Sequence, residues 1–75
     1  MFLTQIKENQ KVIVRAITLS RVDTKRLFYL GIYPGATMKK IMHAPLHDPV
    51  MYMVQGACLV LRIQDAAHIE VEVIV

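Results

Sequence analysis

The sequence predicts a mainly β fold, a small barrel of five short strands with a short helix inserted after the first strand. Three observations support this prediction. Five short segments are rich in β-branched or alternating apolar residues, which is typical of strands. Between the first two segments lies a helix signal, with a capping residue, an apolar face and a terminal glycine. The length of 75 residues suits one domain, which we expect to span residues 1–75.

The first strand is predicted over residues 11–18, a run in which Val and Ile predominate. Leu3 and Ile6 come before this strand and are separated from it by polar, turn-like residues. We therefore expect Leu3 and Ile6 to pack over the barrel as a short lid.

A short helix is predicted over residues 24–30, with Asp23 as its N-cap. Leu27 and Leu30 are three residues apart and share one face of such a helix. A helix of about two turns is unstable alone, so this face is expected to lie against the sheet.

The helix is expected to end at Gly31, which can adopt the left-handed conformation that helix ends require. Ile32 then supplies an apolar contact with Leu27, as in a Schellman ending. Pro34 and Gly35 predict a turn, because proline presets φ and glycine accepts positive φ.

Four more strands follow in the second half of the chain, and two short connections between them are readable from the sequence. Gln55-Gly56 is a two-residue connection suited to a tight hairpin. Residues 64–67 are long enough for one helical turn, which we expect to be of the 3₁₀ type. In the last strand, apolar residues alternate with Glu70 and Glu72, so the two glutamates should face water. The four strands are predicted over residues 37–43, 50–54, 57–62 and 69–75.

Five short strands with a single helical turn before the last are typical of an SH3-like barrel. The helix over residues 24–30 fills the long loop after the first strand. Closing the sheet into a barrel also protects strand edges in so small a domain. A five-stranded OB-like barrel is the structural alternative.

Two stretches of the chain resemble the FeoA (ferrous iron transport protein A) family. Residues 25–35, KRLFYLGIYPG, are similar to its basic-Arg-Leu, Leu-Gly-Ile/Met and Pro-Gly signature. Residues 44–50, APLHDPV, are similar to its Ala-Pro-Leu-Gly-Asp-Pro loop. The likeness covers nearly the whole chain, and the two signatures occur in the expected order and spacing. His47 departs from the family pattern, which has glycine at this position.

The resemblance implies a small cytoplasmic accessory protein of ferrous iron uptake. Such a protein docks on the cytoplasmic, GTP-binding part of FeoB, the membrane transporter for ferrous iron. Related domains also form the C-terminal part of metal-dependent transcriptional repressors, but we expect this chain to act as a stand-alone accessory, without the DNA-binding and dimerisation domains of those proteins. A membrane role is therefore expected to be indirect, through the partner, and no cofactor is expected.

We assign partner binding to Lys25, Arg26, Phe28, Tyr29 and Tyr33. Lys25 and Arg26 are expected in the first helical turn, where positive charge is slightly unfavourable beside the helix dipole. Such a placement favours another use, namely contact with an acidic partner surface. Phe28 and Tyr29 lie beside the apolar helix face, so we expect both to be partly packed, with room for one of them to stay exposed.

Two of the predicted strands have apolar side chains on both faces, and both faces cannot enter one core. In segment 50–54, Met51 and Met53 are on one face of the strand, and Val50, Tyr52 and Val54 are on the other. In the next strand, Cys58 and Val60 are likewise on the face opposite to its other apolar residues. Methionine adapts well to binding surfaces. We expect the inserted helix, a homo-oligomeric contact or a partner protein to cover this outer face.

Composition favours a binding protein of a reducing compartment. The chain has one cysteine and a net charge of +3 that is spread along the sequence. Its N-terminus does not resemble a signal peptide. No uninterrupted apolar run approaches the roughly 20 residues that cross a bilayer. We expect no enzymatic activity, because no phosphate-binding loop or nucleophile motif is present, and Cys58 is expected to be a small packed side chain.

Two other functions remain open at this point. The first is a metal-binding carrier or sensor that uses His43 and His47, which are four residues apart but interrupted by Pro45. The second is a small-barrel nucleic-acid binder that uses the basic residues, although we expect no nucleic-acid partner because these residues do not cluster.

Overall fold

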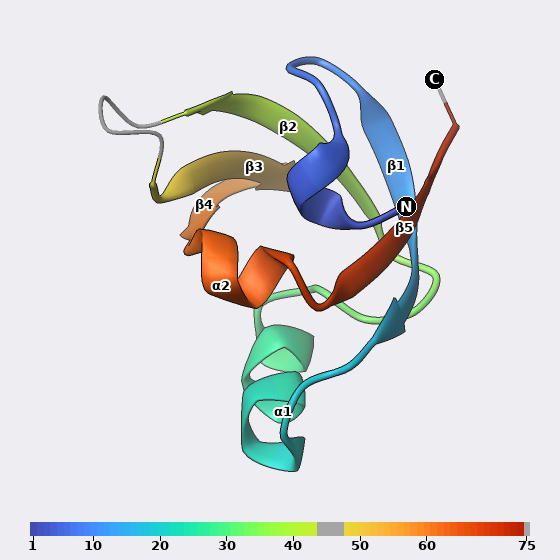
Figure 1. Cartoon of the computed structure of the whole chain (residues 1–75), viewed down its shortest axis with the longest axis vertical. Coiled ribbons are helices and arrows are strands. Elements are labelled where there is room, and N and C mark those ends of the chain that lie inside the picture. The colour runs from blue at the N-terminus through green and yellow to red at the C-terminus, as the bar shows by residue number, and fades with distance from the viewer. Residues whose placement is uncertain (44–47, 75) are drawn as a thin grey trace.

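A computed structural model describes residues 1–43 and 48–74 and confirms the five-stranded, mainly β architecture (Figure 1). Loop residues 44–47, including His47, and the last residue lie outside this description, as do the side chains of Met42 and His43. The strands are β1 (Lys11–Ile17), β2 (Thr37–His43), β3 (Val50–Val54), β4 (Ala57–Leu61) and β5 (Ile69–Val73). The helical elements are η1 (Leu3–Gln5), α1 (Arg21–Tyr29) and α2 (Ile63–Ala66).

The strands form one antiparallel sheet in the order β4-β3-β2-β1-β5, which is the order of an SH3-like barrel. β1 shifts register between Val14 and Ala16, and β2 shifts register between Lys40 and Met42. An extra residue of this kind bends a strand and increases its twist. The two bulges therefore help to curl a sheet of short strands around one interior.

The predicted strands agree with the observed ones to within one or two residues. β2 and β3 have the expected bounds. β1 and β4 each end one residue earlier than predicted, and β5 ends two residues earlier. In β5, Ile69 and Val71 are buried, and Glu70 and Glu72 are exposed, as the alternation indicates. The helical turn before β5 is an α-helix over Ile63–Ala66, so the 3₁₀ prediction is wrong in type and starts one residue late.

The barrel interior is filled by side chains from every strand and from the helical elements η1, α1 and α2. Leu3 and Ile6 are buried at 0% and 3% exposure, which confirms the predicted lid. The backbone of this lid also extends the sheet, because the Val71 amide donates to the Met1 carbonyl at 2.7 Å. The largest fully buried side chains are Tyr52, Leu3, Leu27, Ile32, Met38, Ile69, Val12 and Val14.

Helix α1 begins at Arg21, three residues before the predicted start, and its N-cap is Ser20 rather than Asp23. The Ser20 hydroxyl accepts a hydrogen bond from the Asp23 amide at 3.1 Å and donates one to the Asp23 carboxylate at 3.0 Å. Both residues are good caps, but the serine satisfies an otherwise unpaired N–H of the first turn and leaves Asp23 favourably placed within it.

The end of α1 is the predicted Schellman ending. Gly31 has φ of +93°, and its amide donates to the Phe28 carbonyl at 3.0 Å. The Ile32 amide donates to the Leu27 carbonyl at 2.9 Å, and both side chains are buried in the core. The predicted turn follows, since Gly35 has φ of +98°. These bonds fix the position at which the chain leaves α1 and enters β2.

Helix α2 is capped from a distant part of the sequence. Its first amide, that of Ile63, donates to the Asp48 carboxylate at 3.0 Å, while the preceding Arg62 gives no side-chain cap. Asp48 thereby satisfies one of the orphan donors of the helix start. Within the described ranges, no helix is long and apolar enough to span a membrane.

Candidate docking surface

Helix α1 lies at one end of the barrel and anchors itself there with Leu27, which is fully buried (Figure 1). Leu30 was expected to share this burial, but it is the C-cap residue and is 47% exposed. The helix therefore inserts one leucine into the core and leaves most of its circumference uncovered.

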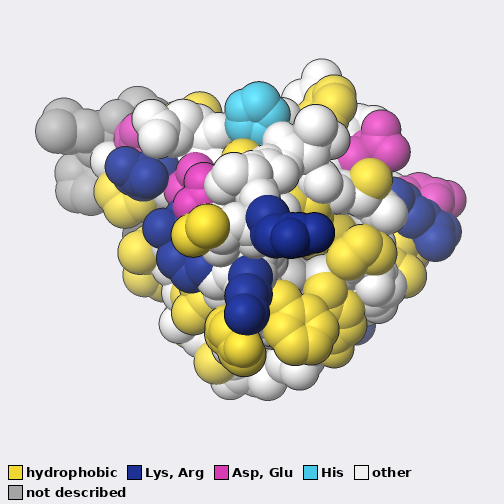
Figure 2. Space-filling view, turned by 90° about the horizontal axis from the view of Figure 1, so that it is seen from below, with side chains coloured by type: hydrophobic (Ala, Val, Ile, Leu, Met, Phe, Trp, Pro, Cys, Tyr) yellow, Lys and Arg dark blue, Asp and Glu magenta, His cyan; other side chains and the backbone are white. Residues whose placement is uncertain are grey.

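Several large apolar side chains of α1 remain in contact with solvent. Val22 is 77% exposed, Phe28 58% and Tyr29 75%. Lys25 is exposed on the same helix. We call Val22, Lys25, Phe28, Tyr29 and Leu30 the α1 surface. Seen from this end of the molecule, hydrophobic side chains gather beside several Lys and Arg side chains (Figure 2).

The aromatic side chains of this region hold one another in place. The ring of Phe28 meets that of Tyr29 edge-on at 6.0 Å and that of Tyr33 at 5.5 Å. The Tyr33 hydroxyl accepts a hydrogen bond from Nε2 of the Gln55 side chain at 2.8 Å, which ties Tyr33 to the turn between β3 and β4. Aromatic side chains that are already ordered lose little conformational freedom on binding, which favours affinity.

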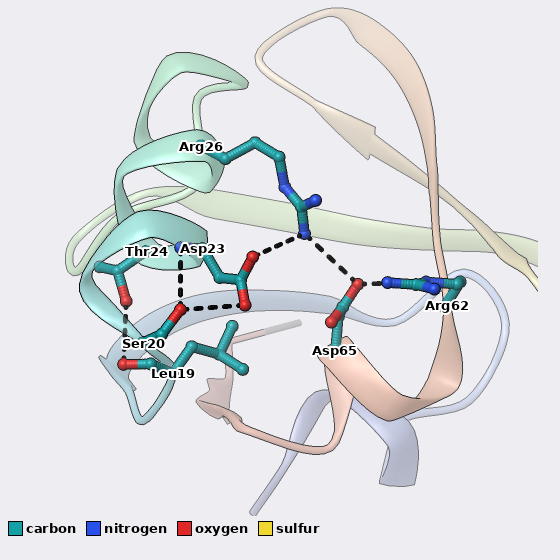
Figure 3. A network of polar contacts seen from close by, with 7 residues as sticks. All are labelled: Leu19, Ser20, Asp23, Thr24, Arg26, Arg62 and Asp65. Atoms are coloured by element: carbon teal, nitrogen blue, oxygen red, sulfur yellow. Dashed lines mark hydrogen bonds and ion pairs between the residues drawn. The ribbon is translucent and has the colours of Figure 1, made fainter.

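Arg26 belongs to an ion-pair network between the two helices (Figure 3). Its guanidinium lies 3.4 Å from Asp23 and 3.7 Å from Asp65, and Arg62 lies 3.6 Å from Asp65. Asp65 is buried at 8% exposure, so it is the most desolvated member. Arg26 thus joins α1 to α2. The prediction that Lys25 and Arg26 sit in the first helical turn is wrong, because the helix starts at Arg21.

A shallow pocket of about 240 Å³ adjoins this network between α1, the end of β4 and α2. Its apolar part includes Leu30 and Val60, and Val60 is 53% exposed. The sequence pattern could not show that Val60 belongs here, because it comes from a strand thirty residues further along. The pocket is lined by Arg26, Leu27, Leu30, Val60, Leu61, Arg62 and Asp65.

The structure places the five predicted partner-binding residues in one region. Lys25, Arg26, Phe28 and Tyr29 lie on α1, and Tyr33 follows it in the connection to β2. Both Phe28 and Tyr29 are exposed, so the expectation that both are partly packed is wrong. Whether this region binds a partner stays a prediction.

The outer face of β3 and β4 is only partly covered, as the two-sided apolar pattern indicated. Met51 is half-buried, Met53 is 36% exposed, and Cys58 is exposed. The expectation that Cys58 is a packed side chain is therefore wrong. Cys58 pairs with Met53 across the hairpin, on the side of the sheet that faces away from the core.

The histidine site proposed from the sequence falls mostly outside the described residues. His43 ends β2 as expected, but its side chain and the whole of His47 are not described. Among the residues that are described, no three His, Cys, Asp or Glu side chains come together in a way that would hold a metal ion.

Together, fold and surface define a small SH3-like barrel domain with an exposed aromatic and basic helix. The chain belongs to the FeoA domain family, whose sequence model matches residues 1–73. It is 34% identical over 74 residues to the Fe(2+) transport protein A/Fe(2+) transporter FeoB fusion protein of Porphyromonas gingivalis. This match covers 99% of the chain but 9% of the fusion protein.

Solved structures agree with this assignment. The FeoA protein of Chlorobium tepidum superimposes with a TM-score of 0.94 at 29% identity, covering 100% of this chain and 71% of that one. FeoA of Stenotrophomonas maltophilia, described as a prokaryotic SH3 domain protein and solved with zinc, gives a TM-score of 0.80 at 24% identity. That match covers 96% of this chain and 89% of the other, and it supports the SH3-like fold.

Proposed function

We propose that this protein is a cytoplasmic accessory of ferrous iron uptake that docks on the cytoplasmic, GTP-binding part of a FeoB-type transporter. The observation that carries the proposal is the Porphyromonas gingivalis relative, in which one chain bears the names of both FeoA and FeoB. Domains that act together are kept at a high effective concentration when they share a chain. Docking of a FeoA domain on a transporter also requires a binding surface on the domain.

The α1 surface has the chemistry that such docking needs. Exposed aromatic and aliphatic side chains supply apolar area, and Tyr in particular is enriched among interface hot spots. Lys25 adds a cation that can meet an acidic patch and speed association. An ordinary interface buries about 800 Å² per partner, which is about a sixth of the 4794 Å² of accessible surface.

The proposal assigns the protein a binding function rather than a catalytic one. Its interior is filled with core side chains, and the pocket beside α1 is shallow. A carrier function with His43 and His47 stays a prediction, and titration with ferrous iron or zinc separates it from docking. Tight stoichiometric metal binding that is lost on His43→Ala with His47→Ala would favour the carrier.

The docking proposal is tested by measuring the affinity of the full chain for the purified cytoplasmic region of the FeoB-type protein from the same organism. Tyr29→Ser removes the most exposed ring of the α1 surface and is expected to weaken binding at least tenfold, as hot-spot truncations do. Lys25→Glu is expected to slow association and to change its salt dependence.

Two variants elsewhere on the barrel serve as controls. Lys39→Glu makes the same charge change on β2, and Ile74→Ser removes an exposed apolar side chain near the C-terminus; both are expected to bind as the parent does. Equal affinity for all five proteins would reject the α1 surface. No binding by the parent chain would reject the docking function itself.

A further inference from the structure

A second small pocket lies near the lid and contains a buried lysine that the docking proposal does not use. This pocket, which we call the Lys40 pocket, has a volume of about 100 Å³. It lies between η1, the strands β2 and β3, and the start of α2. Its lining residues are Thr4, Lys40, Val50, Tyr52 and Ile63.

Lys40 is unusual because its side chain points into the barrel. Its exposure is 5%, whereas its neighbour Lys39 is exposed on the outer face of β2. The ammonium donates one hydrogen bond, to the Ile6 carbonyl at 3.0 Å. In the described part of the chain, no ion pair joins Lys40 to a carboxylate.

This arrangement leaves hydrogen-bonding capacity on the ammonium. A lysine ammonium has three donors, and the Ile6 carbonyl accepts from one of them. Leu3 and Ile6 already hold the lid, because both are buried in the core. The other donors of Lys40 are therefore available to an anion in the pocket that Lys40 lines.

Tyr52 adds a second donor to the same pocket. It pairs with Lys40 across β2 and β3, and its side chain is 1% exposed. The Tyr52 hydroxyl makes no hydrogen bond to the described residues. Among these residues, however, every fully buried side-chain N or O atom has a partner, so the hydroxyl is not fully buried. The hydroxyl therefore opens onto the pocket that Tyr52 lines.

The phenol of Tyr52 is protonated at neutral pH, and burial raises its pKa further, to about 12. At neutral pH the phenol is a hydrogen-bond donor. Thr4 contributes another hydroxyl at the edge, and Val50 and Ile63 form an apolar wall. The pocket thus combines a cation and two hydroxyls with room for about three water molecules at roughly 30 Å³ each.

We propose that the Lys40 pocket binds a small free carboxylate, of acetate size, through the Lys40 ammonium and the Tyr52 hydroxyl. The charge selects an anion, and charge-assisted hydrogen bonds from N–H and O–H donors suit a carboxylate. The volume favours a planar anion with one or two carbons, whose methyl end meets Val50 and Ile63. This site is independent of the docking surface.

The test is a titration of the full, isotopically labelled chain with sodium acetate, followed by amide NMR at constant ionic strength. Saturable shifts are expected at the amides of Thr4, Val50, Tyr52 and Ile63. Acetamide, which has the shape of acetate without its charge, is expected to give none. Lys40→Met is expected to weaken acetate binding at least tenfold, and Tyr52→Phe several-fold.

Lys39→Met is the matched control, since it removes one charge from the adjacent residue of β2 on the outer face. It is expected to bind acetate as the parent does. The dispersion of the amide signals tests whether Lys40→Met folds. If Lys40→Met does not fold, Tyr52→Phe tests the site instead, because it keeps the Lys40 charge and removes only the hydroxyl. The proposal is overturned by equal shifts with acetamide, by equal loss in Lys39→Met, or by shifts that never saturate. Saturation by inorganic phosphate but not by acetate would overturn the carboxylate class.

Discussion

Gly31→Ala tests whether the end of α1 is as constrained as its geometry indicates. Gly31 has φ of +93°, and a methyl group added there would lie 3.3 Å from Cγ1 of Val54, which is buried. A left-handed conformation costs an L-residue about 1–2 kcal/mol, and overpacking adds roughly 1–3 kcal/mol. Together, these two terms should lower the free energy of unfolding by about 2–5 kcal/mol. At about 4–8 °C per kcal/mol for a domain of this size, Tm falls by at least about 8 °C.

Gly35→Ala separates the two contributions. Gly35 also has positive φ, +98°, but a methyl group added there meets nothing within 4 Å. Its cost should be confined to backbone strain, about 1–2 kcal/mol. Thermal and urea denaturation followed by circular dichroism give both values. If Gly31→Ala is no more destabilising than Gly35→Ala, the contact with Val54 has no energetic weight and the reasoning fails.

Two further predictions concern α2 and the core. Asp48→Ala removes the acceptor of the Ile63 amide and should lower the free energy of unfolding by about 0.5–2 kcal/mol. Asp48→Asn keeps an acceptor and should cost less, as urea denaturation would show; equal losses would contradict the capping role. Burial raises the pKa of Tyr52 from about 10 to about 12, so between these values the unfolded chain holds fewer protons than the folded one. Stability should therefore fall as pH rises from 10 to 12, and Tyr52→Phe should show a shallower decline.

Most strand bounds were predictable because each strand ends at a local signal. Gly56 closes the β3–β4 hairpin, with φ of +83°, and Gly31 and Gly35 end the helix and turn. These residues act through their own backbone preferences, which do not depend on the rest of the fold. The start of α1 was missed although its signal is also local. Ser20 and Asp23 are spaced as in a capping box, with aspartate in place of the usual glutamate.

The interactions that the sequence could not show join residues far apart in the chain. The pairing of Arg26 with Asp65 depends on how α1 packs beside α2, and the capping of Ile63 by Asp48 spans fifteen positions. Nor does the pattern of β2 reveal the burial of Lys40. Two adjacent lysines suggest a solvated strand end, yet alternation necessarily points one of them inward.

The pocket beside α1 and the Lys40 pocket each include a residue of α2, so the independence of docking and anion binding can be tested. Asp65 lines the pocket beside α1, and Ile63 lines the Lys40 pocket. Coupling between two sites requires an element with two arrangements that both ligands bias. Helix α2 is one turn, held by Asp48 at its start and by two arginines at Asp65. We therefore expect saturating acetate to leave the affinity for the transporter region unchanged within about twofold, well below the 5–150-fold of typical allosteric coupling. A larger change, measured in the parent and absent in Lys40→Met, would show that α2 moves and that the two proposed sites act as one.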